Sequence, residues 1–239
     1  MCNISKNLEE IQQNIVKSAE KIGKNPNDII LLAVTKTVDI LSIQQVFKLG
    51  ISNFGENKVQ EFLPKYEYFE QNKQNSPFSP FLPSWHFIGN LQTNKVKFIV
   101  DKVQLIHSVG SFRLAEEINK QSVKQKITTN ILLEVNIAEE PTKHGVPPSE
   151  LNGLVEQLSP LENICIKGLM CVAPYTTQPE NNRKYFQKMN EFFLDISQKR
   201  VHNVNMGFLS MGMSDDYVIA IEEGANIVRV GTKLFGHRK

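Results

Sequence analysis

Short apolar runs alternate with helical patterns along almost the whole of this chain, and few folds accommodate that order. The run at 29–34 is continuous and rich in branched residues, as expected for a strand buried on both faces of a parallel sheet. Helical patterns separate most of the strand candidates that follow. These further candidates are 52–55, 85–88, 104–108, 130–137, 164–172, 208–211 and 226–230.

Eight strands, nearly all followed by helices, in 239 residues predict an α/β protein folded as a single (β/α)8 TIM barrel. Apolar residues spaced by threes and fours from Ile4 to Ile22 add an N-terminal helix. A doubly wound open sheet is the alternative, but its usual Gly-rich first turn is missing. No repeat or composition shift marks a second domain, so we expect residues 1–239 to form one domain, with a surface loop at 71–84.

Charge and cysteine content exclude several classes of function. Lys and Arg number 27 against 25 Asp and Glu, which gives no basic footprint for nucleic acid. The three cysteines form no C-x-x-C pair, and neither a signal peptide nor an apolar run long enough for a membrane is present. No histidine has a partner at metal-ligand spacing. We expect a soluble, cytoplasmic, metal-free protein and, without an obvious large apolar surface stretch, a monomer.

Lys36 is the first candidate for a functional residue. Working residues in a TIM barrel come from the carboxyl ends of strands, and Lys36 directly follows the first apolar run. Partial burial there disfavours the ammonium form and supplies a neutral amine suited to attack an aldehyde. A surface lysine at the start of a loop is the alternative. Asn57, after the second strand, either hydrogen-bonds a ligand oxygen or caps the next helix.

The last two strands carry hydroxyls and glycines where barrel enzymes frequently bind phosphate. Ser210 and Ser214 flank Gly212, and Gly231 and Thr232 follow the eighth strand. Glycine lets the backbone approach closely, and N–H and hydroxyl groups satisfy phosphate oxygens. Ordinary turn chemistry is the alternative interpretation.

Two acidic residues oppose a phosphate beside Ser214. Asp215 and Asp216 follow it in what reads as the first turn of a helix, with Ser214 as N-cap. The sequence therefore places the phosphate mainly on Ser210 and on the Gly231–Thr232 turn.

Arg229 lies inside an apolar strand, so its charge requires a partner. Arg229 and Gly231 are two residues apart and share a face, so one ligand reaches the arginine through a ring and the glycine amide through a phosphate. A lysine for a Schiff base, a phosphate turn and an arginine for a ring nitrogen together indicate pyridoxal 5′-phosphate, PLP.

Several motifs carry a family resemblance over essentially the whole chain. They are AVTKT at 33–37, FGEN at 54–57, WHFIGNLQTNK at 85–95, HSV at 107–109, GLM at 168–170, LSMGMSDD at 209–216 and VRVGTKLFG at 228–236. In them the chain resembles the pyridoxal phosphate homeostasis protein family, whose members resemble the N-terminal barrel domain of alanine racemase standing alone. Departures are Thr35 for the usual Ser, Val38-Asp39 for Lys-Pro, and Gly110 for a frequent Asp.

The resemblance implies that Lys36 forms the Schiff base with PLP, that Ser210, Gly231 and Thr232 hold its phosphate, and that Arg229 faces its pyridine nitrogen. It implies a role in intracellular PLP (vitamin B6) homeostasis, with PLP-dependent apo-enzymes as recipients. A permanently cationic arginine disfavours protonation of that nitrogen and weakens the cofactor as an electron sink, which argues against robust turnover. The length also leaves no room for the second domain of a racemase. A PLP-dependent amino-acid racemase of low activity and a Schiff-base aldolase are the rival hypotheses.

Overall fold

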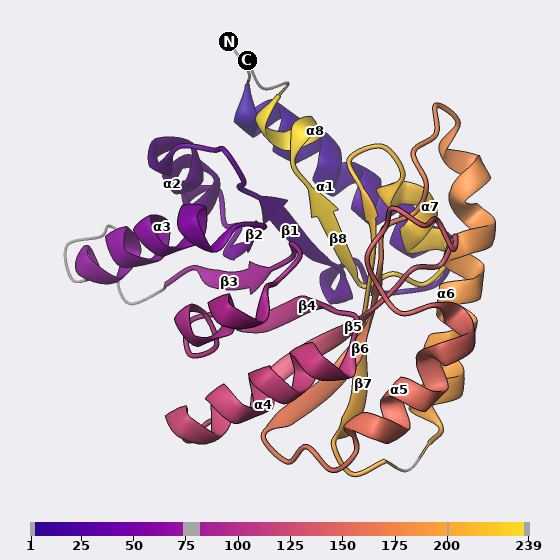
Figure 1. The fold of residues 1–239 in the computed structure, drawn as a ribbon. Helices are drawn as coiled ribbons and strands as arrows, with labels where there is room; N and C mark the ends of the chain where they lie inside the picture. The colour runs from indigo at the N-terminus through magenta and orange to yellow at the C-terminus, as the bar shows by residue number, and fades with distance from the viewer. Residues whose placement is uncertain (1–2, 74–81, 200, 237–239) are drawn as a thin grey trace.

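Eight parallel strands form a closed barrel in chain order within residues 3–73, 82–199 and 201–236, which the computed structural model describes (Figure 1). Pairing of the first strand with the eighth closes it, which confirms the predicted TIM barrel and excludes an open sheet. The strands are β1 (Ile30–Val34), β2 (Asn53–Glu56), β3 (Ser84–Phe87), β4 (Leu105–Val109), β5 (Thr129–Val135), β6 (Ile164–Cys171), β7 (Val204–Met213) and β8 (Ile227–Val230). Most of the loop predicted at 71–84 lies outside the described residues.

Helices surround the barrel and connect its strands (Figure 1). They are α1 (Ile4–Lys21), α2 (Ile40–Lys48), α3 (Val59–Gln71), α4 (Phe112–Gln125), α5 (Leu151–Leu158), α6 (Arg183–Ser197), α7 (Tyr217–Glu222) and α8 (Thr232–Phe235). The third unit differs, because a six-residue 3-10 helix, η2 (Thr93–Phe98), stands between β3 and β4. Short 3-10 turns also lie at Pro26–Asp28, Pro148–Glu150 and Pro179–Asn182.

The N-terminal helix α1 packs beside α7 and α8, at the end of the chain (Figure 1). Its apolar residues at spacings of three and four are the ones it buries, from Ile4 to Ala19. Asn14 Nδ2 donates to the hydroxyl of Tyr217 at 3.0 Å, and Asn7 Nδ2 donates to the carbonyl of Leu234 at 3.0 Å. The predicted additional helix therefore packs against the helices that flank the last strand and joins the two ends of the chain.

Strand alternation sorts the core into two layers. One set of side chains packs between strands and helices, and a smaller apolar cluster fills the barrel interior. That cluster is formed by Leu32, Leu105, Leu132, Met170 and Ile227. Two residues further along several of these strands the interior side chains become polar, and beyond them lies the carboxyl-end mouth.

Strand ends differ from the sequence prediction by one or two residues, except in β7. That strand spans Val204–Met213 instead of 208–211, because its first half alternates between half-buried and exposed positions and lacks an apolar run. Its pairing with β8 shifts in register between Ser210 and Met213. Gly212 lies in this shift with φ +86°, a backbone conformation that favours glycine.

Candidate functional site

A cavity of about 400 Å³ opens at the carboxyl ends of β1, β2, β3, β6, β7 and β8. Its size is within the range of about 300–1,000 Å³ typical of small-molecule sites. Six of the seven residues predicted from the sequence line it together: Lys36, Asn57, Ser214, Arg229, Gly231 and Thr232. Val34, Ile88, Val172 and Met213 add apolar walls, and Asp215 lies at its exposed rim.

Lys36 reaches the cavity because β1 alternates. Leu32 belongs to the interior cluster, Val34 lines the cavity, and Lys36 follows two residues later, half-buried. The next residue, Thr37, has φ +59°, and its N–H donates to Glu61 Oε2 at 2.7 Å. That N–H is the main reason why the pKa of Glu61 lies below its ordinary value.

A buried ion pair lies on the outer side of β1, behind Lys36. Lys65 Nζ donates to Glu56 Oε1 at 2.6 Å and to the Thr35 carbonyl at 2.7 Å. The Thr35 hydroxyl donates to the same carboxylate oxygen at 2.6 Å. These three residues, here called the Glu56 network, fix the peptide that leads into Lys36. Glu56 therefore does not face the mouth, since its side chain is fully buried in this network.

Asn57 points to the cavity and not to a helix N-terminus. The N-cap of α3 is Lys58, so Asn57 is not a capping residue. Its Oδ1 is buried and has no hydrogen-bond partner among the described residues. Gly89 lies against it so closely that a Cβ there would stand 2.1 Å from the Asn57 carbonyl oxygen. The cavity wall between β2 and β3 thus requires glycine at position 89.

Ser214 occupies a different place from the one predicted. The N-cap of α7 is Asp216, whose Oδ1 accepts from the Met213 N–H at 2.6 Å, so Ser214 does not cap that helix. Its Oγ instead accepts from the N–H groups of Gly231 and Lys233, both at 3.3 Å. The hydroxyl therefore lies at the Gly231–Thr232 turn, within the cavity lining.

Ser210 is the predicted site residue that the structure does not bring to this cavity. It is fully buried in the barrel interior, where Arg229 Nη1 donates to its Oγ at 2.7 Å. Arg229 Nη2 donates to the Cys171 carbonyl at 2.8 Å. Arg229 lines the cavity and is 4% exposed, so the partners required by its buried charge are one hydroxyl and one carbonyl oxygen. Burial lowers the pKa of Arg229.

Two histidines continue from Ser210 across the barrel interior. His107 Nδ1 lies 3.0 Å from Ser210 Oγ, and His107 Nε2 lies 2.9 Å from His86 Nδ1. Burial lowers the pKa of His86 to about 4. Burial, the neighbouring His86 and the cation of Arg229 together hold the pKa of His107 well below its ordinary value. His86 and His107 thus form a buried pair, one from β3 and one from β4.

Cys171 is a packing residue in this arrangement. It is fully buried, and burial raises the pKa of its thiol to about 12. Among the described residues Cys165 and Cys171 are free thiols.

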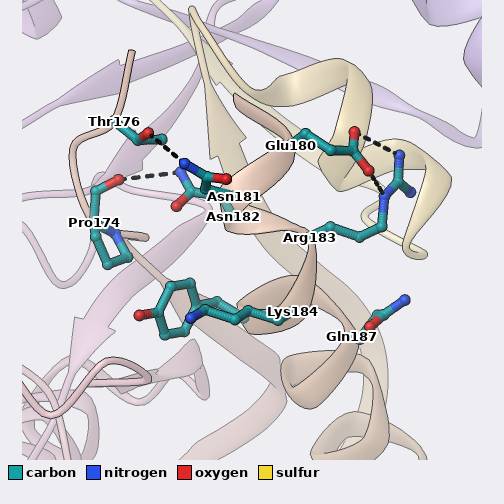
Figure 2. A pocket seen from close by; sticks show the side chains of 9 residues that line it. Pro174, Thr176, Glu180, Asn181, Asn182, Arg183, Lys184 and Gln187 are labelled. Carbon is teal, nitrogen blue, oxygen red and sulfur yellow. Dashed lines mark hydrogen bonds and ion pairs between the residues drawn. The ribbon is translucent and has the colours of Figure 1, made fainter. Parts of the chain in front are cut away.

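A wider depression of about 560 Å³ lies outside the barrel, over Pro179–Asn182 and the start of α6 (Figure 2). Several of its polar groups are already paired. Arg183 contacts the carboxylates of Glu180, Glu222 and Glu223, and Asn182 Nδ2 donates to the Pro174 carbonyl. The cavity at the barrel mouth is the better candidate because it holds Arg229, a cation that makes no ion pair with a carboxylate among the described residues.

The described residues contain neither a metal-binding cluster nor a membrane-spanning helix. No group of three or more His, Cys, Asp or Glu side chains in the described ranges is arranged to hold a metal ion. Likewise, none of the described helices is long and apolar enough to span a membrane.

Comparison with known proteins gives a consistent result. Residues 6–239 match the family of the alanine racemase N-terminal domain. The pyridoxal phosphate homeostasis protein of Aquifex aeolicus is 44% identical over 237 residues, which cover 99% of each chain. The protein of the same name from Escherichia coli K12 is 31% identical over 238 residues, covering 100% of this chain and 98% of that one.

Solved structures agree with the sequence relatives. PipY of Synechococcus elongatus, solved with PLP bound, has a TM-score of 0.82 and 30% identity, covering 98% of this chain and all of its own. The crystal structure of an unknown protein from Bifidobacterium adolescentis has a TM-score of 0.90 and 31% identity, covering 97% of this chain and 94% of that one. An alanine racemase of Clostridium difficile shares the fold, with a TM-score of 0.66 at 17% identity; the match covers 99% of this chain and 57% of the racemase.

The barrel is therefore one of the alanine racemase N-terminal type. Within that type, the full-length relatives are homeostasis proteins, and the chain belongs to the pyridoxal phosphate homeostasis protein family.

Proposed function

We propose that this protein binds PLP in the carboxyl-end cavity through a Schiff base on Lys36 and holds the cofactor in reserve within the cell. The observation that carries the proposal is that Lys36, Arg229 and the Gly231–Thr232 turn line one cavity. The relatives named for PLP homeostasis and the PLP-bound neighbour support it.

The donors present suit each part of this cofactor. Ser214, Gly231 and Thr232 offer a hydroxyl-rich turn for the phosphate, and Arg229 offers a cation to the ring nitrogen. The unpartnered Asn57 oxygen is a buried acceptor in need of a donor. Asp215 is the one carboxylate among the lining residues described, and it lies exposed at the rim. Ser214 replaces Ser210 in the phosphate role proposed here.

When bound, the cofactor supplies an aldehyde for the lysine and a ring that can draw electrons from it. Arg229 keeps its charge, because an arginine does not lose its proton in proteins. A permanent cation beside the ring nitrogen disfavours a proton there, so this chain's own residues weaken the electron sink.

A second feature argues against turnover. Racemisation requires acid/base groups on both faces of the substrate Cα. Among the described lining residues the amine of Lys36 and the carboxylate of exposed Asp215 are such groups, and none is a histidine, tyrosine or cysteine. We therefore propose that the protein acts in the cytoplasm as a monomeric carrier that passes PLP to apo-enzymes.

Titration of the purified protein with PLP, followed by absorbance, tests the binding site. We expect a protein-bound band in the wild type and in the exposed-lysine control Lys17→Ala, and none in Lys36→Ala. A band that survives in Lys36→Ala would overturn the site. Retention of bound PLP would also exclude the aldolase hypothesis.

Incubation of the loaded protein with a panel of amino acids in heavy water tests for turnover. The carrier hypothesis predicts no Cα-proton exchange above the rate with free PLP. Exchange accompanied by inverted product, and lost in Lys36→Ala, would favour the racemase.

A further inference from the structure

Four polar side chains form a continuous chain across the barrel interior, below the cavity. His86 comes from β3, His107 from β4, Ser210 from β7 and Arg229 from β8. Successive contacts measure 2.9 Å, 3.0 Å and 2.7 Å, and each residue is at most 4% exposed. We call these four residues the interior polar chain.

The direction of every hydrogen bond in this chain follows from Arg229. A guanidinium only donates, so Ser210 Oγ accepts from it and the hydroxyl proton remains for His107 Nδ1. His107 then carries its proton on Nε2 and donates it to His86 Nδ1. His86 in turn carries its proton on Nε2.

The opposite order leaves more buried groups unsatisfied. If His107 donated to Ser210, the hydroxyl would accept twice, and its own proton would face no third partner among the described residues. His86 Nε2, buried and unpartnered in the described structure, would remain unsatisfied in either order. One orphaned group is less costly than two, because each buried donor or acceptor without a partner has lost its hydrogen bonds to water and gained none in return.

The hydrogen bonds of the interior polar chain also require both imidazoles to be neutral. A proton added to His86 Nδ1 would place two N–H groups face to face, and a proton added to His107 Nδ1 would take the acceptor from Ser210. The lowered pKa values of both histidines agree with this requirement.

We propose that Ser210 and His107 are positioning residues that hold Arg229 at the cavity, with His86 fixing the tautomer of His107. The inference rests on the proposed function, because it gives the orientation of Arg229 its importance to a bound PLP ring. Ser210 and the Cys171 carbonyl anchor the two guanidinium Nη atoms, which fixes the plane of the group. Both anchors are neutral, so the charge of Arg229 remains available to the cavity.

Nitrogen-15 NMR of the histidine rings in the full-length protein tests the chain without any cofactor. At pH 7 we expect His86 and His107 to be neutral, with the proton on Nε2. The exposed His144 and His202 serve as internal references. A proton on His107 Nδ1, or an imidazolium at either position, would overturn the assignment.

A double-mutant cycle on the PLP-loaded protein tests positioning. We expect Ser210→Ala and His107→Leu each to speed PLP release about tenfold, or about 1.4 kcal/mol. Since both break the same chain, the double variant should also be about tenfold faster, not a hundredfold. Ser210→Thr, which keeps the hydroxyl, should stay within about twofold of the wild type.

Ser108→Ala is the matched control, because Ser108 is also a buried hydroxyl but has no hydrogen-bond partner among the described residues. Its PLP release should equal that of the wild type. Release unchanged in Ser210→Ala, or multiplied in the double variant, would overturn the positioning role. A wild type that binds no PLP would instead overturn the proposed function, and the NMR result would then decide the hydrogen-bond chain alone.

Discussion

Two buried polar networks hold the two principal residues of the candidate site, and they handle charge in opposite ways. Outside the barrel wall, the Glu56 network supports Lys36 with an ion pair, in which Lys65 Nζ and Glu56 Oε1 lie 2.6 Å apart. Inside the barrel, Arg229 donates to the Ser210 hydroxyl and the Cys171 carbonyl, and the imidazoles of His107 and His86 continue the interior polar chain from Ser210.

The difference separates structural charge from charge available to a ligand. Lys65 and Glu56 cancel one another, so this pair fixes the backbone of β1 and adds little field at the cavity. Arg229 donates to two neutral oxygens, while Glu134 and Asp216 affect it only through space. A cation whose hydrogen-bond acceptors are neutral keeps its full positive charge, and that charge acts on a ligand at the mouth.

The largest effect is expected from breaking the ion pair. Lys65→Met leaves the fully buried carboxylate of Glu56 without its cation, which should lower the free energy of unfolding by about 3–5 kcal/mol. Urea denaturation measures this loss. Lys120→Ala, which breaks the surface pair with Glu117, should change stability by less than about 1 kcal/mol. Equal losses in both variants would show that the buried pair has no special role.

The interior polar chain, with its neutral histidines, should instead lose its contribution to stability in acid. The unfolded chain binds a proton on His86 near pH 6.5, but the folded protein resists it until about pH 4. The contribution of His86 to the free energy of unfolding is therefore complete above about pH 6.5. It falls by about 3 kcal/mol as the pH drops toward 4. Urea titrations at several pH values measure the slope, and His86→Asn should make it shallower. An identical slope in that variant would contradict the assignment.

The cavity wall between the two networks gives a smaller effect. Gly89→Ala places a Cβ against the Asn57 carbonyl and should cost about 1–3 kcal/mol of stability while weakening PLP binding. Gly153→Ala is the matched control, since nothing lies within 4 Å of a Cβ there and the position is inside α5. That control should be stabilising by about 0.5–1 kcal/mol. A neutral result at Gly89 would mean that the wall relaxes.

The smallest effect is expected at the turn that receives the phosphate. Ser214→Ala removes one hydroxyl and should weaken PLP binding about fivefold, equal to about 1 kcal/mol. Equilibrium titration by absorbance measures it, with the exposed Ser197→Ala as control. Unaltered affinity in Ser214→Ala would remove this serine from the proposed site.

Much of this arrangement follows from the sequence by simple rules. Side chains of a strand alternate with a period of two. Lys36 lies two residues after Val34, and Arg229 lies two residues after Ile227, so the alternation predicts both at the mouth. The same rule predicts the barrel, since each apolar run supplies one strand.

Ser210 shows where the rule stops. It shares its strand face with Phe208 and lies one layer too deep for the cavity, and the register shift at Gly212 delivers Ser214 instead. A bulge of this kind depends on the backbone around a single glycine and leaves no periodic signal.

One member of the Glu56 network, Lys65, could have been recognised from the sequence as a buried lysine. Lys65 lies three residues after Phe62 and four before Phe69, on the buried face of α3. A lysine on an apolar helix face requires a buried partner, and Glu56 is the acidic residue at the end of the strand beside it. Their pairing itself needed the three-dimensional arrangement, because the two residues belong to different elements.

Borohydride reduction of the PLP-loaded protein, followed by mass mapping of the labelled peptide, tests the central claim most directly. Reduction makes the lysine–cofactor bond permanent, so the label reports which amine the aldehyde reached. The account predicts that Lys36 alone carries the label. Label on another lysine, or no label on a protein that retains PLP, would contradict it.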